Sequence, residues 1–148
     1  QRPALNVGLS VSRVGSAAQT KAMKSVSKTL KVDLAQFREL EAFAQFATDL
    51  DESTKKQLDR GARAMQLMKQ KQYAPISFDQ QSVIIYALNS GLLDDVDVDR
   101  ILEFEEKFLY FMQSSGASVL KAIQESKKVE EATEEELKNF IAEFKKTF

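Results

Sequence analysis

Two hydrophobic periods divide the chain. Between residues 4 and 14, apolar positions alternate with polar or small ones, and the apolar set is Leu5, Val7, Leu9 and Val11. A period of two is typical of a half-buried β-strand. After residue 16 the apolar residues recur three and four positions apart, which indicates amphipathic helices. The pattern therefore predicts one N-terminal strand followed by a helical region.

The predicted strand stands alone, because no other segment alternates in this way. The N–H and C=O groups of a single strand need a partner strand. We therefore expect it to pair with another copy of itself or to belong to a sheet outside this polypeptide. The expected fold class is mainly α: a bundle of about six to seven helices, residues 16–148, preceded by one orphan N-terminal β-strand, residues 1–15.

Capping signals set the expected helix boundaries. A basic first helix is expected from Ala17 to about Leu30, and a second over 34–48 with Asp33 as its N-cap. Asp51 is expected to cap a third helix. The later signals are a Ser77–Gln80 capping box, a stop at Asn89-Ser90-Gly91, an Asp97 N-cap, a short helix over 118–125 and a Thr133–Glu136 capping box.

The phenylalanines, ten in all, follow these helical stripes. Phe104, Phe108 and Phe111, for example, recur at spacings of four and three. Aromatic residues at helical spacing fill the core of a bundle far more often than they line a ligand site. We interpret them as core residues.

Composition removes several classes of chemistry. The 148 residues include no cysteine and no histidine. Disulfides, thiol nucleophiles, Cys/His metal sites and His-based catalytic triads within the chain are therefore excluded. No apolar run approaches the ~20 residues that a membrane-spanning helix needs, so direct membrane insertion is not expected. The net charge of −1 gives no overall field that favours nucleic acid.

The charge is unevenly distributed along the sequence. Residues 1–32 contain six basic residues and no acidic one, whereas the rest carries 15 basic and 22 acidic residues, a net charge of −7. A basic segment on an acidic body suggests that the segment faces a phosphate or an acidic partner surface. The alternative is a solvated lysine face on a helix.

Arg13 is the first candidate functional residue. It falls at the carboxyl end of the predicted strand, just before the glycine turn at Gly15. Strand ends of this kind open onto the ligand crevice in α/β sheets, and an arginine there can bind a phosphate with its fork of donors. Alternatively Arg13 caps a carbonyl or pairs with an acid. No glycine precedes a lysine, so the sequence has no Walker loop.

The second candidate is the polar segment Lys69-Gln70-Lys71-Gln72-Tyr73-Ala74-Pro75. Two glutamines flanking a lysine can present amide donors and acceptors to a flat heteroaromatic edge. The alternative is a solvated helix end whose lysines answer the helix dipole.

Two groups of acids offer weaker signals. The run 94–99 lacks the turn glycine and twelfth-position glutamate of a calcium loop, and a loop with an N-cap explains it. Glu105 and Glu106 lie on different flanks of a helix and are not expected to act as an acid–base pair.

Several of these segments resemble the alpha subunits of F-type ATP synthases. The run Arg-Pro-Ala-Leu-Asn-Val-Gly-Leu-Ser-Val-Ser-Arg-Val-Gly-Ser-Ala-Ala-Gln at residues 2–19 is similar to the end of their nucleotide-binding domain. The likeness continues through 33–46, Arg60-Gly-Ala-Arg63 and 69–75, and weakens toward Phe108 and beyond. Lys28 stands where the family usually carries a glycine, so the first helix is expected to run longer here.

The resemblance implies a role for each candidate residue. Arg13 matches the family's arginine finger, which reaches the γ-phosphate in a neighbouring beta subunit, and Ser10 matches a position important for activity. The adenine of a non-catalytic nucleotide would contact the loop that holds Gln70, Lys71 and Gln72; Arg2 and Pro3 match residues near that nucleotide.

The resemblance also implies cofactors and partners. The full assembly would bind ATP or ADP with Mg²⁺, whereas this polypeptide in isolation is expected to be inactive and to bind no nucleotide tightly. Its partners would be the beta subunit, the gamma rotor subunit and the other subunits of the complex, besides self-association through the strand. The complex would be peripheral to the membrane on its ATP-producing face, on the cytoplasmic side in bacteria or its organellar equivalent.

A second function class stays open from the residues alone. The protein is then a standalone helical module that binds other proteins through an amphipathic surface and has no catalytic role. In that case residues 1–14 would be ordered against the bundle or dispensable for folding.

Overall fold

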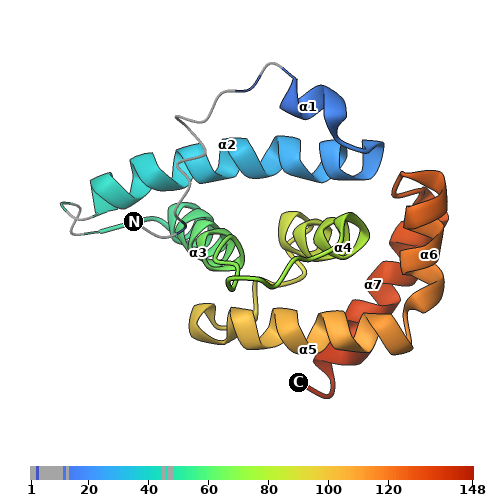
Figure 1. The fold of residues 1–148 in the computed structure, drawn as a ribbon. Helices are drawn as coiled ribbons and strands as arrows, with labels where there is room; N and C mark the ends of the chain where they lie inside the picture. Colours follow the sequence, from blue (N-terminus) through green and yellow to red (C-terminus); the bar gives the residue numbers. More distant parts are fainter. Residues whose placement is uncertain (1–2, 4–11, 13, 45, 47–48) are drawn as a thin grey trace.

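Over the residues that the structure describes, the fold is a bundle of seven α-helices and one 3-10 turn (Figure 1). The computed structural model describes Pro3, Ser12, residues 14–44, Phe46 and residues 49–148. In order, the elements are α1 (Gly15–Ala18), α2 (Lys21–Ala44), α3 (Glu52–Leu67), α4 (Phe78–Asn89), η1 (Val98–Arg100), α5 (Ile101–Ser114), α6 (Ala117–Ser126) and α7 (Glu131–Lys145). The predicted mainly helical class is confirmed, and the described residues contain no strand. The strand predicted over 4–14 falls almost wholly outside them.

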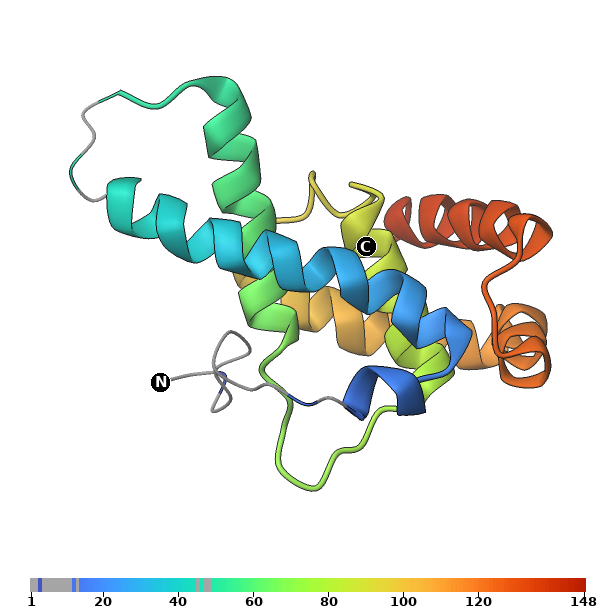
Figure 2. The same cartoon turned by 90° about the horizontal axis from the view of Figure 1, so that it is seen from above.

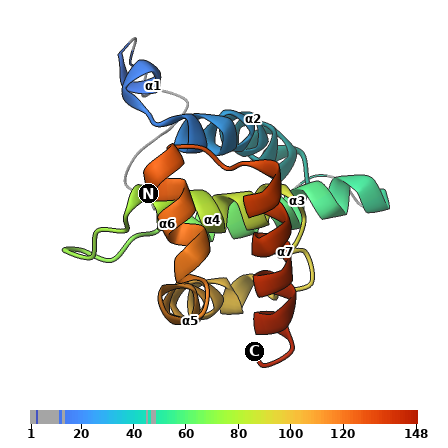
Figure 3. The same cartoon turned by 90° about the vertical axis from the view of Figure 1, so that its right-hand side faces the viewer.

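The helices enclose an apolar core. The long helix α2 packs across α3 and α4, and α5 runs along the opposite side of this pair (Figures 1 and 2). Figure 3 shows α6 and α7 closing one end, where both contact α4 and α5. At the centre, the largest fully buried side chains include Leu88, Ile101, Phe104, Phe108, Ile123, Leu137 and Ile141. None of the described helices is both long and apolar enough to cross a membrane.

Helix α2 is continuous through Asp33, so the N-cap predicted there is wrong. Leu30 and Leu34 are both buried, and these positions are one turn apart on the face that contacts the core. Burial of that apolar row favours an unbroken helix over the local preference of an aspartate for a helix start. The helix begins after Thr20, whose Oγ1 accepts a hydrogen bond from the Met23 N–H at 3.3 Å. It continues through Lys28, in agreement with the longer helix expected from a lysine at that position.

Some of the other boundary predictions are confirmed, and one is wrong. Asp51 caps α3, since its carboxylate accepts from the Thr54 N–H, and Gly91 ends α4 at φ +73°. Ser77 precedes α4 as predicted, but its hydroxyl contacts Gln80 Oε1 instead of a backbone N–H. The Thr133 capping box is wrong, because α7 starts two residues earlier at Glu131 and Thr133 lies inside it.

Most phenylalanines fill the core, as the helical stripes predicted. The rings of Phe104, Phe108 and Phe144 lie 5.2–5.5 Å apart by centroid, in stacked, tilted and edge-on pairs. Such pairs add about 0.5–1.5 kcal/mol beyond the area they bury. Phe43 and Phe46 are exceptions, with 63% and 87% of their surfaces exposed. They lie at the C-terminal end of α2 and just after it, beyond the reach of the core.

The crossing of α2 and α3 depends on a glycine. A Cβ on Gly61 would lie 2.3 Å from the ring of Phe37, a distance that real Cβ atoms do not adopt. Both residues are buried. The missing side chain therefore lets the two helices approach closely at this point.

A buried arginine fixes α3 against the segment before η1. Arg63 is 7% exposed and donates from Nε to the Val96 carbonyl at 2.7 Å and from Nη2 to the Asp94 carbonyl at 2.8 Å. A buried guanidinium is stable only when its donors are satisfied, and these carbonyls supply acceptors. The segment 94–96 is thereby held on α3.

We expect the Gly61→Ala substitution to destabilise the fold by about 1–3 kcal/mol, because the new methyl group overpacks the Phe37 contact. This loss opposes the gain of roughly 1 kcal/mol that alanine usually brings to a helix. Urea unfolding followed by circular dichroism measures the change. The control compares Gly61→Ala in the parent with Gly61→Ala in a Phe37→Ala background, where the ring atoms that lie 2.3 and 2.4 Å from the new Cβ are absent, so the substitution should cost less there. Gly61→Ala that is neutral or stabilising in the parent contradicts the close-approach account.

Candidate functional site

The predicted site residues fall into two groups. Arg2, Ser10 and Arg13 lie outside the described residues, so the structure does not test their placement. Pro3 is described as a half-buried bend. Gln70, Lys71 and Gln72 lie on the exposed loop between α3 and α4, as the sequence predicted.

Side chains hold this loop in a defined conformation. Gln70 Nε2 donates to the Ala74 carbonyl at 2.8 Å, so this hydrogen bond connects the two ends of the turn. Lys71 Nζ lies 3.0 Å from Glu106 Oε2 on α5. Lys71 therefore forms an exposed ion pair with a neighbouring helix.

Tyr73 has an unusual backbone conformation at the tip of the loop. Its φ is +57°, in the left-handed region, and 93% of its surface is exposed. This conformation costs a bulky non-glycine residue of order 1 kcal/mol, and such strain concentrates at functional sites. The turn thus leaves the side chain of Tyr73 exposed at the tip of the loop, directly after Gln72.

The loop also offers unused backbone donors. Within the described part of the protein, the N–H groups of residues 70–73 donate no hydrogen bond. Each N–H needs an acceptor from water or a ligand. Together with the exposed Gln72 amide, these groups could bind a flat ring that carries both donors and acceptors along its edge.

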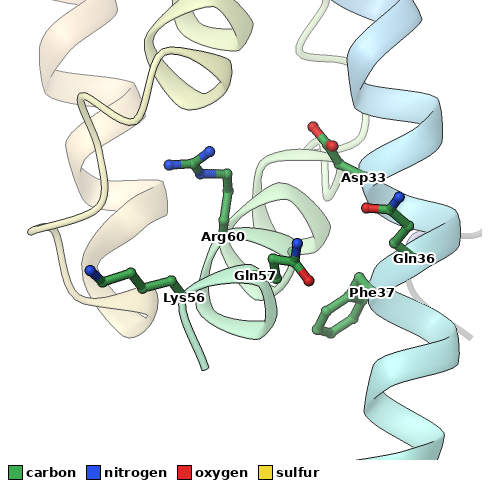
Figure 4. Close-up of a pocket in the computed structure, with 7 residues that line it drawn as sticks. Asp33, Gln36, Phe37, Lys56, Gln57 and Arg60 are labelled. Atoms are coloured by element: carbon green, nitrogen blue, oxygen red, sulfur yellow. The ribbon is translucent and has the colours of Figure 1, made fainter. Parts of the chain in front are cut away.

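A cavity of about 170 Å³ at the α2–α3 crossing lies apart from the loop (Figure 4). Asp33 and Arg60 line it from opposite helices. Burial raises the pKa of Asp33 above its ordinary value, and the Arg60 cation opposes that rise. Arg60 is itself committed to a two-point contact with Asp94, at 3.2 Å from Nε and 2.5 Å from Nη2. Arg60, one of the two cationic residues that line the cavity, is therefore already engaged in holding the segment before η1 against α3.

The first two acidic residues of the run 94–99 form ion pairs within the protein. Asp94 pairs with Arg60, and Asp95 pairs with Lys145 on α7. Within the described residues, no three acidic side chains converge as metal ligands would. The run thus connects α3 and α7 through the segment before η1.

A second cavity, of about 150 Å³, adjoins the loop. Its apolar walls come from α3, α4 and the segment between them: Leu67, Met68, Ile76, Ile84 and Ile85. Gln70, Gln81 and Glu105 supply its polar atoms. The loop that carries the exposed amides therefore rests on an apolar hollow with one carboxyl group in its wall.

Glu105 is a residue whose properties the sequence analysis missed. Burial first, and the neighbouring Glu106 second, raise the pKa of Glu105 to about 7. Glu105 lies midway between Ile101 and Leu109, four residues from each, and both are buried. A carboxyl group at the edge of an apolar helical row was the available signal, but α3 and α4 decide how far it is desolvated.

The family model and the individual relatives found by comparison with known proteins point to the same family. A sequence model described as "ATP synthase alpha/beta chain, C terminal domain" matches residues 19–144. The protein is 54% identical over 147 residues, 99% of its length, to "ATP synthase subunit alpha" of Janthinobacterium sp. (strain Marseille). It is 55% identical over 148 residues, its full length, to the protein of the same name in Syntrophomonas wolfei subsp. wolfei (strain DSM 2245B / Goettingen). In both comparisons it spans 29% of the relative's length.

We expect stability to depend on pH through Glu105. Because its pKa in the fold is raised to about 7 from 4.5, the folded state binds the proton more tightly than the unfolded state does. Stability from this group is therefore present below about pH 4.5 and lost as the pH rises through 7. Glu105→Gln should accordingly be more stable than the parent at pH 8, on the order of 1 kcal/mol after discounting for solvent screening, and nearly equal at pH 4.5.

Urea unfolding at the two pH values checks this expectation. Glu103→Gln is the control on the same helix, since hydrogen bonds from Lys107 and Arg100 lower the pKa of Glu103 and its substitution should not stabilise the fold at pH 8. An equal effect of Glu105→Gln at both pH values would show that desolvation does not govern this carboxyl group.

Proposed function

Because this protein belongs to the family defined by the C-terminal domain of ATP synthase alpha and beta subunits, we propose that it is part of the alpha subunit of a proton-translocating F-type ATP synthase. The observation that carries this proposal is an identity of 54–55% to two bacterial alpha subunits over essentially its whole length. In this assignment residues 1–15 form the last strand of a nucleotide-binding domain and residues 16–148 the C-terminal helical domain.

The catalytic part of the proposal rests on Arg13. Its guanidinium would reach across a subunit boundary to the γ-phosphate of ATP in a beta subunit, with Ser10 on the same strand. A planar cation with several donors can stabilise the charge that spreads over the phosphoryl oxygens during transfer. The nucleotide and its Mg²⁺ would belong to the neighbouring site, which accounts for the expected inactivity of this polypeptide alone.

The second part concerns a non-catalytic nucleotide. Gln70, Lys71 and Gln72 would contact its adenine ring, with Arg2 and Pro3 near it. The unused N–H groups of residues 70–73 support this role, since an adenine edge offers ring nitrogens as acceptors and an amino group as donor. The exposed loop would supply one side of such a site.

The proposed partners and place follow from the same assignment. The protein would assemble with the beta subunit, the gamma rotor subunit and the other subunits of the complex. The complex would lie against the ATP-producing face of a membrane, the cytoplasmic face in a bacterium. The organisms named in the comparison favour the bacterial location.

The substitution Arg13→Lys in the full-length subunit tests the catalytic role. We expect normal assembly and a loss of ATP turnover of about 10³-fold or more, because an ammonium group cannot reproduce the bidentate geometry of guanidinium. Steady-state hydrolysis by the purified complex measures the loss. Arg100→Lys is the matched control, since Arg100 forms an exposed pair with Glu103 and its loss should leave turnover unchanged. Normal turnover by Arg13→Lys would remove the arginine finger from the proposal.

A further inference from the structure

Asp79 is the only acidic residue in the described part of the protein that is buried, with 2% of its surface exposed. It lies in the first turn of α4, directly after Phe78. Its Oδ2 accepts a hydrogen bond from Gln124 Nε2 at 3.1 Å, but its Oδ1 has no hydrogen-bond partner among the described residues. A buried carboxylate needs a donor at each oxygen, so Oδ1 requires one that the described residues do not supply.

The other two buried polar side chains of the described protein do have partners. Arg63 donates to the carbonyls of Asp94 and Val96, and the Ser82 hydroxyl donates to the Phe78 carbonyl at 2.6 Å. The positive end of the α4 dipole favours an acid in the first turn, but this gain is much smaller than the cost of burying an unpaired charge. Helix capping therefore does not account for the unpaired oxygen.

Two lysines near the start of α4 make other contacts. Lys121 Nζ lies 3.9 Å from Glu125 Oε1, one turn away on α6. Lys127 Nζ lies 4.7 Å from the centre of the Phe78 ring. Neither lysine forms an ion pair with Asp79. The negative charge is thus left without a cation by the side chains nearest to it in the fold.

Asp79 lines a cavity of about 520 Å³ between the start of α4, the end of α5 and α6; we call it the Asp79 cavity. Helix α6 contacts both of the other helices (Figure 3). The side-chain amides in its wall belong to Gln80, Gln113 and Gln124, and its apolar wall to Ala117 and Leu120. Cavities of roughly 300–1,000 Å³ are typical of small-molecule sites.

Gln124 controls access to the carboxylate. Its side chain is exposed, it lines the cavity, and its amide donates to Asp79 Oδ2. A rotation of this side chain would open Asp79 to the cavity, and a ligand could then donate to both carboxylate oxygens. The site therefore needs only a side-chain movement to become accessible.

The chemistry of the wall selects the ligand. A carboxylate accepts hydrogen bonds and carries one negative charge, so the matching group brings one positive charge and several N–H donors. The amide oxygens of Gln80 and Gln113 are further acceptors for such a group. Ala117 and Leu120 can cover a short alkyl chain, whereas an anion would face the Asp79 charge. An ammonium or guanidinium group on a short alkyl chain meets these requirements.

We propose that the Asp79 cavity binds a small organic cation of this kind. The cation donates to Oδ1 of Asp79 and takes the place of the Gln124 amide at Oδ2, and its alkyl chain lies on Ala117 and Leu120. The site is separate from Arg13 and from the loop 70–73, so it adds a ligand that the proposed function does not require.

Calorimetric titration of the full-length subunit with n-butylammonium and n-butylguanidinium tests the site. We expect saturable binding of both with a Kd on the order of 1 mM, and no binding of the neutral n-butanol. Asp79→Asn keeps the shape of the side chain and removes its charge, and it should weaken binding about tenfold or more. Glu125→Gln is the matched control, since it removes an equal charge from an exposed position on the same cavity and should change the affinity less than about threefold.

A second variant keeps the carboxylate, so the test does not depend on the folding of Asp79→Asn. Gln124→Ala removes the amide that covers Asp79, and it should tighten binding about threefold or more because both carboxylate oxygens become available. Binding that neither Asp79→Asn nor Gln124→Ala changes would place the cation elsewhere and overturn the proposal. Equal losses in Asp79→Asn and Glu125→Gln would also overturn it, since the effect would then be one of net charge.

Other occupants of the cavity give different results. Lys121→Gln should leave the affinity within about threefold; a tenfold rise would show that Lys121 itself fills the cavity and would overturn the proposal. A crystal structure of the full-length subunit, alone and in its complex, identifies the remaining alternatives. A basic side chain from the rest of the subunit or from a neighbouring subunit on Asp79, or a single water molecule there without saturable binding, would overturn the small-molecule site. None of these outcomes bears on the proposed function, which does not involve Asp79.

Discussion

The close approach of α2 to α3 at Gly61 is the constraint on which the arrangement depends. A glycine there lets the ring of Phe37 lie against the backbone of α3, and any side chain would force the helices apart. Since α3 leads directly into the loop 68–77, its position against α2 sets where that loop begins. The same crossing brings Asp33 of α2 beside Arg60 of α3, so packing and charge coincide at one place.

Interactions of different strength hold the loop that the proposal assigns to adenine. The Lys71–Glu106 pair is largely exposed, at 78% and 72%, and a pair of that kind contributes about 0–1 kcal/mol. Apolar contacts of Leu67 and Ile84 beneath the loop are better protected from water. The loop is therefore positioned by the burial of its ends, whereas at its exposed tip the Gln72 amide and the N–H groups of residues 70–73 form no hydrogen bond among the described residues.

Charge is organised at a larger scale than single pairs. The acids of the segment before η1 are taken up by Arg60 and Lys145, which link distant helices. The four lysines in the N-terminal half of α2 have no such partners among the described residues; they are Lys21, Lys24, Lys28 and Lys31. The uneven charge of the sequence thus has two structural consequences. Some acidic residues after residue 32 form ion pairs that connect helices, and the lysines before residue 32 remain exposed at the surface.

The sequence by itself determined the helical class, the family and the elements whose signals are local. Asp51 and Gly91 act through the backbone within a few residues, so their roles could be predicted from the sequence alone. The exposed loop at Gln70 was predictable for the same reason, since a proline and polar residues bound it.

Only the tertiary structure decided the features that depend on contacts between distant residues. Asp33 looked like a helix start, but the burial of Leu30 and Leu34 against α4 and its neighbours carries α2 through it. The sequence identified Glu105 only as one of two adjacent acids on a helix, whereas in the fold α3 and α4 cover one side of it and burial raises its pKa. A local capping preference of about 1 kcal/mol is smaller than the free energy gained by burying a whole apolar row of a helix. Desolvation of a side chain cannot be predicted from its sequence neighbours, because it depends on which distant helix covers the group.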